Sequence, residues 1–306
     1  MLDFEELTWQ HKASYEEFYR KSPVHYAEYS FSNLWTWKDA YPLKLAFDRK
    51  NNLCWVKFKA EHLASDGICG PVGDWNDANI DWQDALSHLD LESNPVIYDV
   101  PEQVKEILSS HEIFAAKLQF YDEPGQDEYV YSVQELISLK GKNFAHKRNR
   151  LRAFLTGYEW DYYEIKPENF QDIMDFQERW RLNRDLSLES EEIESLQDEN
   201  RAIKLTLEHW NDFKFLGAML KIDDSIIAYT IAEDLDGESL DVKFEKAFAE
   251  YSGSYQAMNQ LFLKNHGFAY KFANREEDLD EPGLREAKLS YNPVKMLRKF
   301  TLRFSD

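Results

Sequence analysis

Three short runs of strand-forming residues, separated by two pairs of turn residues, constrain the fold more than any other feature of this chain. The runs cover residues 215–222, 226–233 and 239–244, and Asp223-Asp224 and Asp236-Gly237 separate them. Aspartate and glycine accept the backbone conformations of tight hairpin turns, so consecutive runs of this kind pair as antiparallel strands. Because a loop, a helix and a further strand follow, the second half predicts an α+β domain with a mostly antiparallel sheet.

The first half of the chain repeats this mixture of helices and strands. Residues 43–47 and 53–58 predict a hairpin, and Pro101 stands where a proline favours the start of a helix. A chain of 306 residues exceeds what one core usually holds, so two domains are expected. We place them at residues 1–158 and 159–306, with most of the expected site in the second. No Pro- or Gly-rich linker separates them, which predicts that they pack together.

Charge and cysteine content exclude several classes of protein. A formal net charge of −21 disfavours general binding of DNA, because an acidic surface repels phosphate backbones. Cys54 and Cys69 are too few for a disulfide framework, and no Cys/His spacing is typical of a metal site. The N-terminus lacks the regions of a signal peptide, and no apolar run reaches the ~18 residues of a membrane span. We therefore expect a soluble, cytoplasmic protein without a transmembrane segment.

Residues 140–154, KGKNFAHKRNRLRAF, form a basic island in this acidic chain. On a helix of about 100° per residue, Lys147 and Arg148 fall inside an apolar stripe. The apolar members of that stripe are Phe144, Leu151, Phe154 and Leu155. Charges on an inward-facing stripe are unfavourable unless something pairs with them. A bound phosphate or carboxylate meets this need, with Arg148 as a bidentate fork, and so do acidic residues of the other domain.

The loop at residues 250–254 leads into the expected helix over residues 255–266. Backbone N–H groups at a helix N-terminus bind anions, and Ser252 or Ser254 can cap this end. Gly253 is compatible with a phosphate cradle, although one glycine fits a plain loop equally well.

Two further groups of residues are candidates for chemistry. Glu245 and Lys246 follow the end of a strand, where Glu245 is a candidate general base and a surface ion pair is the alternative. Residues 274–291, NREEDLDEPGLREAKLSY, carry polar side chains that together would surround one anionic ligand. These are Asn274, Arg275, Lys288 and Tyr291.

Three segments in this order, KGKNFAHKRNRLRAF, FEKAFAEYSGSYQAMN and NREEDLDEPGLREAKLSYNP, resemble the soluble C-terminal domain of phosphatidylglycerol lysyltransferases. The resemblance covers roughly residues 20–300 and includes the family's KRN as Lys147, Arg148 and Asn149. It implies two tandem GNAT-like domains, of the acyl-CoA N-acyltransferase fold, related to the peptidoglycan-bridge aminoacyl transferases. It also implies that the loop at 250–254 lies where GNAT enzymes hold the pyrophosphate of coenzyme A.

The function expected from this resemblance is aminoacyl or acyl transfer from an activated donor to an amine or hydroxyl acceptor. The donor is either a charged tRNA or a coenzyme A thioester. Glu245 would accept the proton, Lys246, Tyr255 or Asn259 would orient the donor, and Lys147 and Arg148 would hold a phosphate. A tRNA would dock if residues 140–152 and 295–303 form one basic face. The alternatives are an N-acetyltransferase using acetyl-coenzyme A and a non-catalytic ligand-binding module on a GNAT scaffold.

Overall fold

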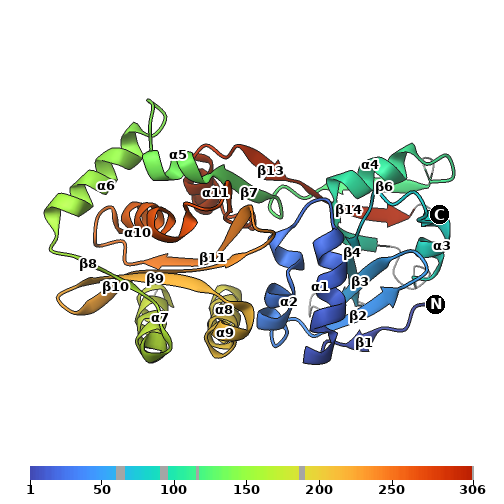
Figure 1. The fold of residues 1–306 in the computed structure, drawn as a ribbon, viewed down its shortest axis with the longest axis horizontal. Helices are drawn as coiled ribbons and strands as arrows, with labels where there is room; N and C mark the ends of the chain where they lie inside the picture. Colours follow the sequence, from blue (N-terminus) through green and yellow to red (C-terminus); the bar gives the residue numbers. More distant parts are fainter. Residues whose placement is uncertain (60–65, 90–95, 115–116, 186–189, 305–306) are drawn as a thin grey trace. The chain divides into compact units, whose positions relative to one another are not determined.

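The computed structural model describes residues 1–59, 66–89, 96–114, 117–185 and 190–304. They form two compact units, each with its own sheet (Figure 1). The first unit contains Met1–Glu128, Glu277–Glu281 and Met296–Asp306, and the second contains Tyr129–Glu276 and Pro282–Lys295. No helix of the described residues is both long and apolar enough to cross a membrane.

The first unit is built on a sheet with the strand order β1-β2-β3-β4-β5-β14-β6. The strands are β1 (Glu5–Glu6), β2 (Leu43–Asp48), β3 (Leu53–Phe58), β4 (Gly67–Gly73), β5 (Val96–Pro101), β6 (Leu118–Asp122) and β14 (Lys299–Phe304). The helices are η1 (Trp9–His11), α1 (Lys12–Lys21), η2 (Ala27–Tyr29), α2 (Phe31–Trp37), α3 (Trp82–Ser87) and α4 (Glu102–Ser110). The expected hairpin is present as β2 and β3, which pair antiparallel from Leu43↔Phe58 to Asp48↔Leu53.

The second unit is built on a sheet with the order β13-β7-β12-β11-β10-β9-β8. The strands are β7 (Glu128–Ser132), β8 (Asp161–Glu164), β9 (Leu216–Ile222), β10 (Ser225–Asp234), β11 (Ser239–Ala247), β12 (Phe272–Asn274) and β13 (Lys295–Leu297). The helices are α5 (Val133–Ser138), α6 (Ala145–Gly157), η3 (Pro167–Asn169), α7 (Phe170–Asp185), α8 (Ser190–Glu208), α9 (Trp210–Phe213), α10 (Ser254–Phe262), η4 (Leu263–Gly267) and α11 (Pro282–Leu289). β9, β10 and β11 form the antiparallel meander that the two turn pairs predict.

The division between the units differs from the expected boundary at 158/159. β7 pairs antiparallel with β12 of the second sheet, so this strand and the α5 and α6 helices that follow it belong to the second unit. β14 lies between β5 and β6 and returns the end of the chain to the first sheet. Pairing between strands far apart in sequence sets this division, and no local pattern of residues marks it.

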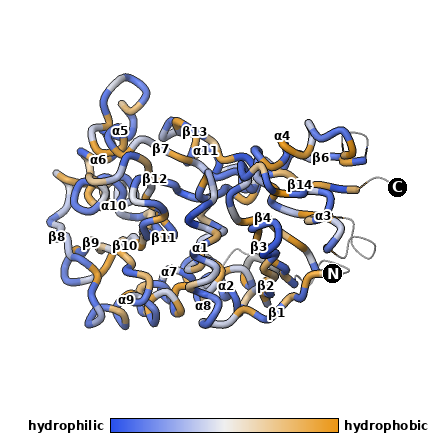
Figure 2. Tube along the Cα trace, turned by 45° about the vertical axis from the view of Figure 1, so that its right-hand side comes forward, coloured by the Kyte–Doolittle hydropathy of each residue, from blue (hydrophilic) through white to orange (hydrophobic). Residues whose placement is uncertain are grey.

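Helices cover both faces of the second sheet. α10 contacts β9, β10 and β11 on one face and also packs against α6, whereas α7 contacts β10 on the other face (Figure 1). Hydrophobic and hydrophilic residues alternate along strands and helices in Figure 2, as expected for elements with one buried face. The candidate site lies on the α10 side of this sheet.

Candidate functional site

The site is positioned by the separation of two parallel strands. β11 and β12 pair only from Ser239↔Phe272 to Asp241↔Asn274, after which β12 ends and β11 continues to Ala247. Glu245 therefore lies on the part of β11 that has no β12 partner, and Arg275 is the first residue after β12.

Glu245 and Arg275 form an ion pair beyond the end of the β11–β12 pairing. Arg275 Nη2 donates to Glu245 Oε1 at 2.8 Å, and the two side chains are 14% and 7% exposed, Arg275 being the more exposed. Asn259 of α10 donates through Nδ2 to Glu245 Oε2 at 3.0 Å. Both carboxylate oxygens therefore accept a hydrogen bond from the protein. Arg275 Nη1 is buried and has no hydrogen-bond partner within the described residues.

Two cations share the ring of Tyr291. The Arg275 guanidinium carbon lies 4.8 Å from the ring centroid, and Lys147 Nζ lies 4.0 Å from it. Tyr131 of β7 packs edge-on against Tyr291 and also faces Arg275 at 5.7 Å. We call Lys147, Glu245, Asn259, Arg275, Tyr131 and Tyr291 the Arg275 cluster.

The electrostatics of the Arg275 cluster favour an additional negative charge. Lys147 is only 7% exposed, and no carboxylate of the described residues lies within ion-pair distance of its Nζ. Burial, reinforced by the nearby charges of Arg275 and Arg150, lowers the pKa of Lys147 to about 8. Burial also raises the pKa of Tyr291 to about 12, so this phenol stays protonated. The cluster thus holds two buried cations and one buried carboxylate.

Residues of the C-terminal segment hold the backbone of Arg275 in place through hydrogen bonds. Lys288 of α11 donates through Nζ to the Arg275 carbonyl oxygen at 2.6 Å, and Tyr131 donates its hydroxyl to the Lys288 carbonyl at 2.9 Å. Asn274 is 1% exposed and accepts the Glu276 N–H at 2.9 Å. The structure thus brings Arg275, Lys288 and Tyr291 together, and Asn274 is the last residue of β12, directly before Arg275.

Arg148 and Asn149 lie elsewhere. α6 forms as expected and buries Lys147, but Arg148 and Asn149 are exposed. The Arg148 guanidinium donates to the carbonyl oxygens of Leu139 and Gly141, the latter at 2.6 Å. The prediction that Arg148 lies on the inward stripe is wrong, because its long side chain bends back to fix the α5–α6 connection.

Glu245 and Lys246 point to opposite faces of the sheet, since consecutive strand residues alternate. Lys246 Nζ pairs with Glu199 of α8 at 2.6 Å and lies 4.3 Å from the Trp180 ring centroid of α7. The structure therefore separates the two residues that the sequence proposed as a catalytic pair.

The loop at residues 250–254 packs directly against α6. Gly253 has a positive φ of 92°, and a Cβ at this position would collide with the Arg150 carbonyl oxygen. The Ser252 N–H donates to the Tyr158 hydroxyl at 3.2 Å, and Ser252 Oγ accepts from Arg150 at 3.0 Å. Ser254 Oγ donates to the Phe248 carbonyl at 3.0 Å. Tyr255, the next residue, is half-buried. Arg150 of α6 and Tyr158, the residue after α6, thus occupy part of the hydrogen-bonding capacity of this loop.

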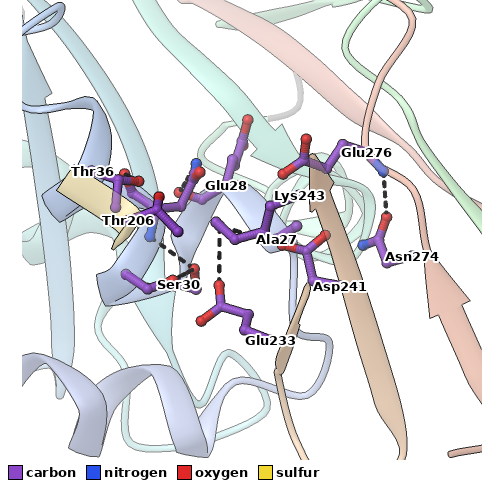
Figure 3. A network of polar contacts seen from close by, with 12 residues as sticks. Ala27, Glu28, Ser30, Thr36, Thr206, Glu233, Asp241, Lys243, Asn274 and Glu276 are labelled. Carbon is purple, nitrogen blue, oxygen red and sulfur yellow. Dashed lines mark hydrogen bonds and ion pairs between the residues drawn. The ribbon is translucent and has the colours of Figure 1, made fainter. Parts of the chain in front are cut away.

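Sequence reasoning missed Tyr131 and a buried charged group around Lys243, which precedes Glu245 by two residues on β11. Lys243 of β11 pairs with Glu233 at 3.1 Å and with Asp241 at 3.4 Å (Figure 3). Amino-acid composition does not reveal that Glu233 and Asp241 are buried. Their positions inside otherwise apolar strand runs are the sequence signal that could have identified them. Tyr131 has no such signal, because only the pairing of β7 with β12 brings it to the site.

Residues 20–303 match the sequence family described as phosphatidylglycerol lysyltransferase, C-terminal. The chain belongs to this family. This confirms the resemblance drawn from the three motifs. One curated relative of the chain is an uncharacterized protein of Mycoplasmoides gallisepticum. It is 25% identical over 181 residues, which cover 57% of this chain and 55% of the relative. The match therefore spans about half the length of that protein.

Solved structures extend the comparison to the fold. A conserved protein of unknown function from Bacteroides thetaiotaomicron is 28% identical, with a TM-score of 0.86 and full coverage of both chains. L-PGS from Bacillus licheniformis is 13% identical over 98% of this chain and 92% of its own, with a TM-score of 0.63. A tandem GNAT protein from the clavulanic acid biosynthesis pathway is 9% identical over the full length of both chains, with a TM-score of 0.54. The expected fold class, two tandem GNAT-like domains with mostly antiparallel sheets flanked by helices, is confirmed.

Proposed function

We propose that this protein is an aminoacyl transferase and that the Arg275 cluster is its reaction site. The observation that carries the proposal is the pair of buried cations, Lys147 and Arg275, which share one tyrosine ring while a single buried carboxylate offsets their charge. Buried charge without a partner is unfavourable, so this arrangement is suited to an anionic ligand or to the negative charge of a transition state. Family membership supports aminoacyl transfer in general.

The chemistry assigns different roles to the two cations. An acceptor amine or hydroxyl attacks the ester carbonyl of the aminoacyl donor, and the carbonyl oxygen gains negative charge. Arg275 is suited to stabilise that oxygen, because its buried Nη1 is an unused donor. Lys147, with a pKa of about 8, is neutral often enough near neutral pH to take the proton from the acceptor. The proton then passes to the leaving hydroxyl of the donor as the ester bond breaks.

Glu245 is better suited to position these groups than to act as the base. Both of its oxygens already accept hydrogen bonds, from Arg275 and Asn259. Its carboxylate fixes the guanidinium that faces the reacting carbonyl. Lys246 lies on the other face of the sheet, so we assign it no part in the reaction.

A charged tRNA is the donor that the geometry supports over a coenzyme A thioester. The Ser252 N–H, which would otherwise be available to a pyrophosphate, donates to Tyr158, and Arg150 contacts the same loop. The exposed side of α6 and the segment before it are basic, which suits the phosphates of a tRNA end. The exposed basic residues there are Lys140, Lys142, His146, Arg150 and Arg152. Lys299, from the second expected basic segment, is 1% exposed and pairs with Glu28, so it is not available to a nucleic acid.

The test is release of radiolabelled amino acids from a charged tRNA mixture, with hydroxylamine as a surrogate acceptor, beside thiol release from acetyl-coenzyme A. We expect aminoacyl hydroxamate from tRNA and no thiol. Lys147→Met and Arg275→Gln should abolish the product, whereas Lys264→Met, which removes an exposed charge of η4, should retain it. Thiol release would instead identify an N-acetyltransferase. Phosphate binding at the cluster without turnover of either donor would identify a non-catalytic binding module.

A further inference from the structure

A hollow lies in the second unit, where β10 begins and β11 has ended. It has a volume of about 320 Å³ and shares no lining residue with the Arg275 cluster. Small-molecule sites usually have volumes of about 300–1,000 Å³, so this hollow suits a ligand of amino-acid size. Its apolar wall contains Ile226, Ile227 and Phe248, which are buried, and Leu182, which is half exposed.

Two opposite charges line the same hollow without pairing. Arg179 of α7 stacks over the Phe248 ring at 5.6 Å, and its polar contact is a long one, from Nη2 to the Ile226 carbonyl oxygen at 3.4 Å. Within the described part of the chain, neither Arg179 nor Glu250 forms an ion pair, with each other or with another residue. A guanidinium has five N–H donors, so most of those of Arg179 remain available.

We infer that this hollow binds a small zwitterion with an apolar side chain, of the size of a branched or aromatic amino acid. The carboxylate of the ligand pairs with Arg179, its ammonium group pairs with Glu250, and its side chain contacts the wall of Ile226, Ile227 and Phe248. A simple anion would leave Glu250 facing the ligand with like charge, and a simple cation would do the same to Arg179. The inference does not depend on the proposed function.

Three compounds with the same branched apolar chain separate these requirements. L-leucine carries both charges, 4-methylpentanoate lacks the ammonium group, and 3-methylbutylamine lacks the carboxylate. Titration calorimetry on the full chain, with methyl NMR of Ile226 and Ile227, measures their binding. We expect leucine to bind at least about tenfold more tightly than either analogue, because each charged contact contributes on that scale. Equal binding of leucine and 4-methylpentanoate would overturn the inference, and so would no heat and no methyl shift at about 10 mM leucine.

Matched variants locate the site. Arg179→Gln and Glu250→Gln should each weaken leucine binding at least about tenfold. Arg181→Gln is the control, because Arg181 lies two residues further along α7 and pairs with Glu178 at 2.8 Å. It should bind leucine as the unmodified protein does. Arg179 and Glu250 are exposed and Arg181 is partly exposed, and a circular dichroism melt confirms folding of each variant. Unchanged binding in Arg179→Gln would overturn the assignment, and hydroxamate formation from charged tRNA is not expected to change in it.

Discussion

Replacement of Glu245 by glutamine tests the charge balance of the Arg275 cluster. The substitution keeps the size of the side chain and one acceptor for Asn259, but it removes the negative charge beside Arg275, whose side chain is 14% exposed. Breaking a buried ion pair from one side costs about 3–5 kcal/mol. Because the stacking of Arg275 on Tyr291 and Tyr131 remains, we expect the lower end, a loss of about 3 kcal/mol in the free energy of unfolding. For a unit of this size, that corresponds to a fall in Tm of about 6–12 °C.

Urea denaturation and calorimetry measure this loss, with Glu238→Gln as the control. Glu238 pairs with Lys271 at 2.5 Å, but both side chains are more than half exposed, so the control should lose less than about 1 kcal/mol. Inorganic phosphate should stabilise Glu245→Gln more than it stabilises the unmodified protein, because Lys147 and Arg275 then lack any compensating charge. Equal losses in the two variants, together with no phosphate effect, would refute the reasoning.

Further substitutions test Lys147, Gly253 and Arg148 separately, with Gly237→Ala as the control for Gly253. Lys147 has a pKa depressed to about 8 in the folded protein, so between pH 8 and about 10.5 the unfolded chain binds more protons than the folded one. The unmodified protein should therefore gain stability relative to Lys147→Met as the pH rises through that window, measured by denaturation curves at each pH. Gly253→Ala should cost several kcal/mol in unfolding free energy, and Gly237→Ala only about 1 kcal/mol, because both have positive φ but only the first would collide with backbone. Arg148→Ala should lower the free energy of unfolding by about 1–3 kcal/mol, since two carbonyls lose a donor, while phosphate affinity measured by calorimetry stays unchanged.

Much of the fold could be predicted from local patterns. The turn pairs Asp223-Asp224 and Asp236-Gly237 fix the β9–β11 meander, because both allow a positive φ at the turn. The course of the chain between the two sheets could not be predicted. β7 and β14 each pair with strands that lie more than a hundred residues away in the sequence, and no single segment carries that information.

The sequence predicts the direction of a side chain correctly where helical geometry determines it, and incorrectly where the length of the side chain determines it. Periodicity places Lys147 inward on α6, next to Phe154, and the structure agrees. The same periodicity places Arg148 inward, but its side chain is long enough to reach carbonyl oxygens just after α5. A helical projection gives the direction of a side chain from the helix axis and does not show which backbone groups a long side chain can reach. Strand alternation alone is enough to place the neighbouring side chains of Glu245 and Lys246 on opposite faces of the sheet.

The pH dependence of aminoacyl transfer is the most direct test of the central claim that Lys147 and Arg275 form a reaction site. We predict that the rate of hydroxamate formation from charged tRNA, corrected for the uncatalysed reaction, rises with pH, is half-maximal near pH 8 and levels off above it, following deprotonation of Lys147. The rise should be absent in Lys147→Met and retained in Lys264→Met. The same profile and rate in Lys147→Met as in the unmodified protein would contradict the account.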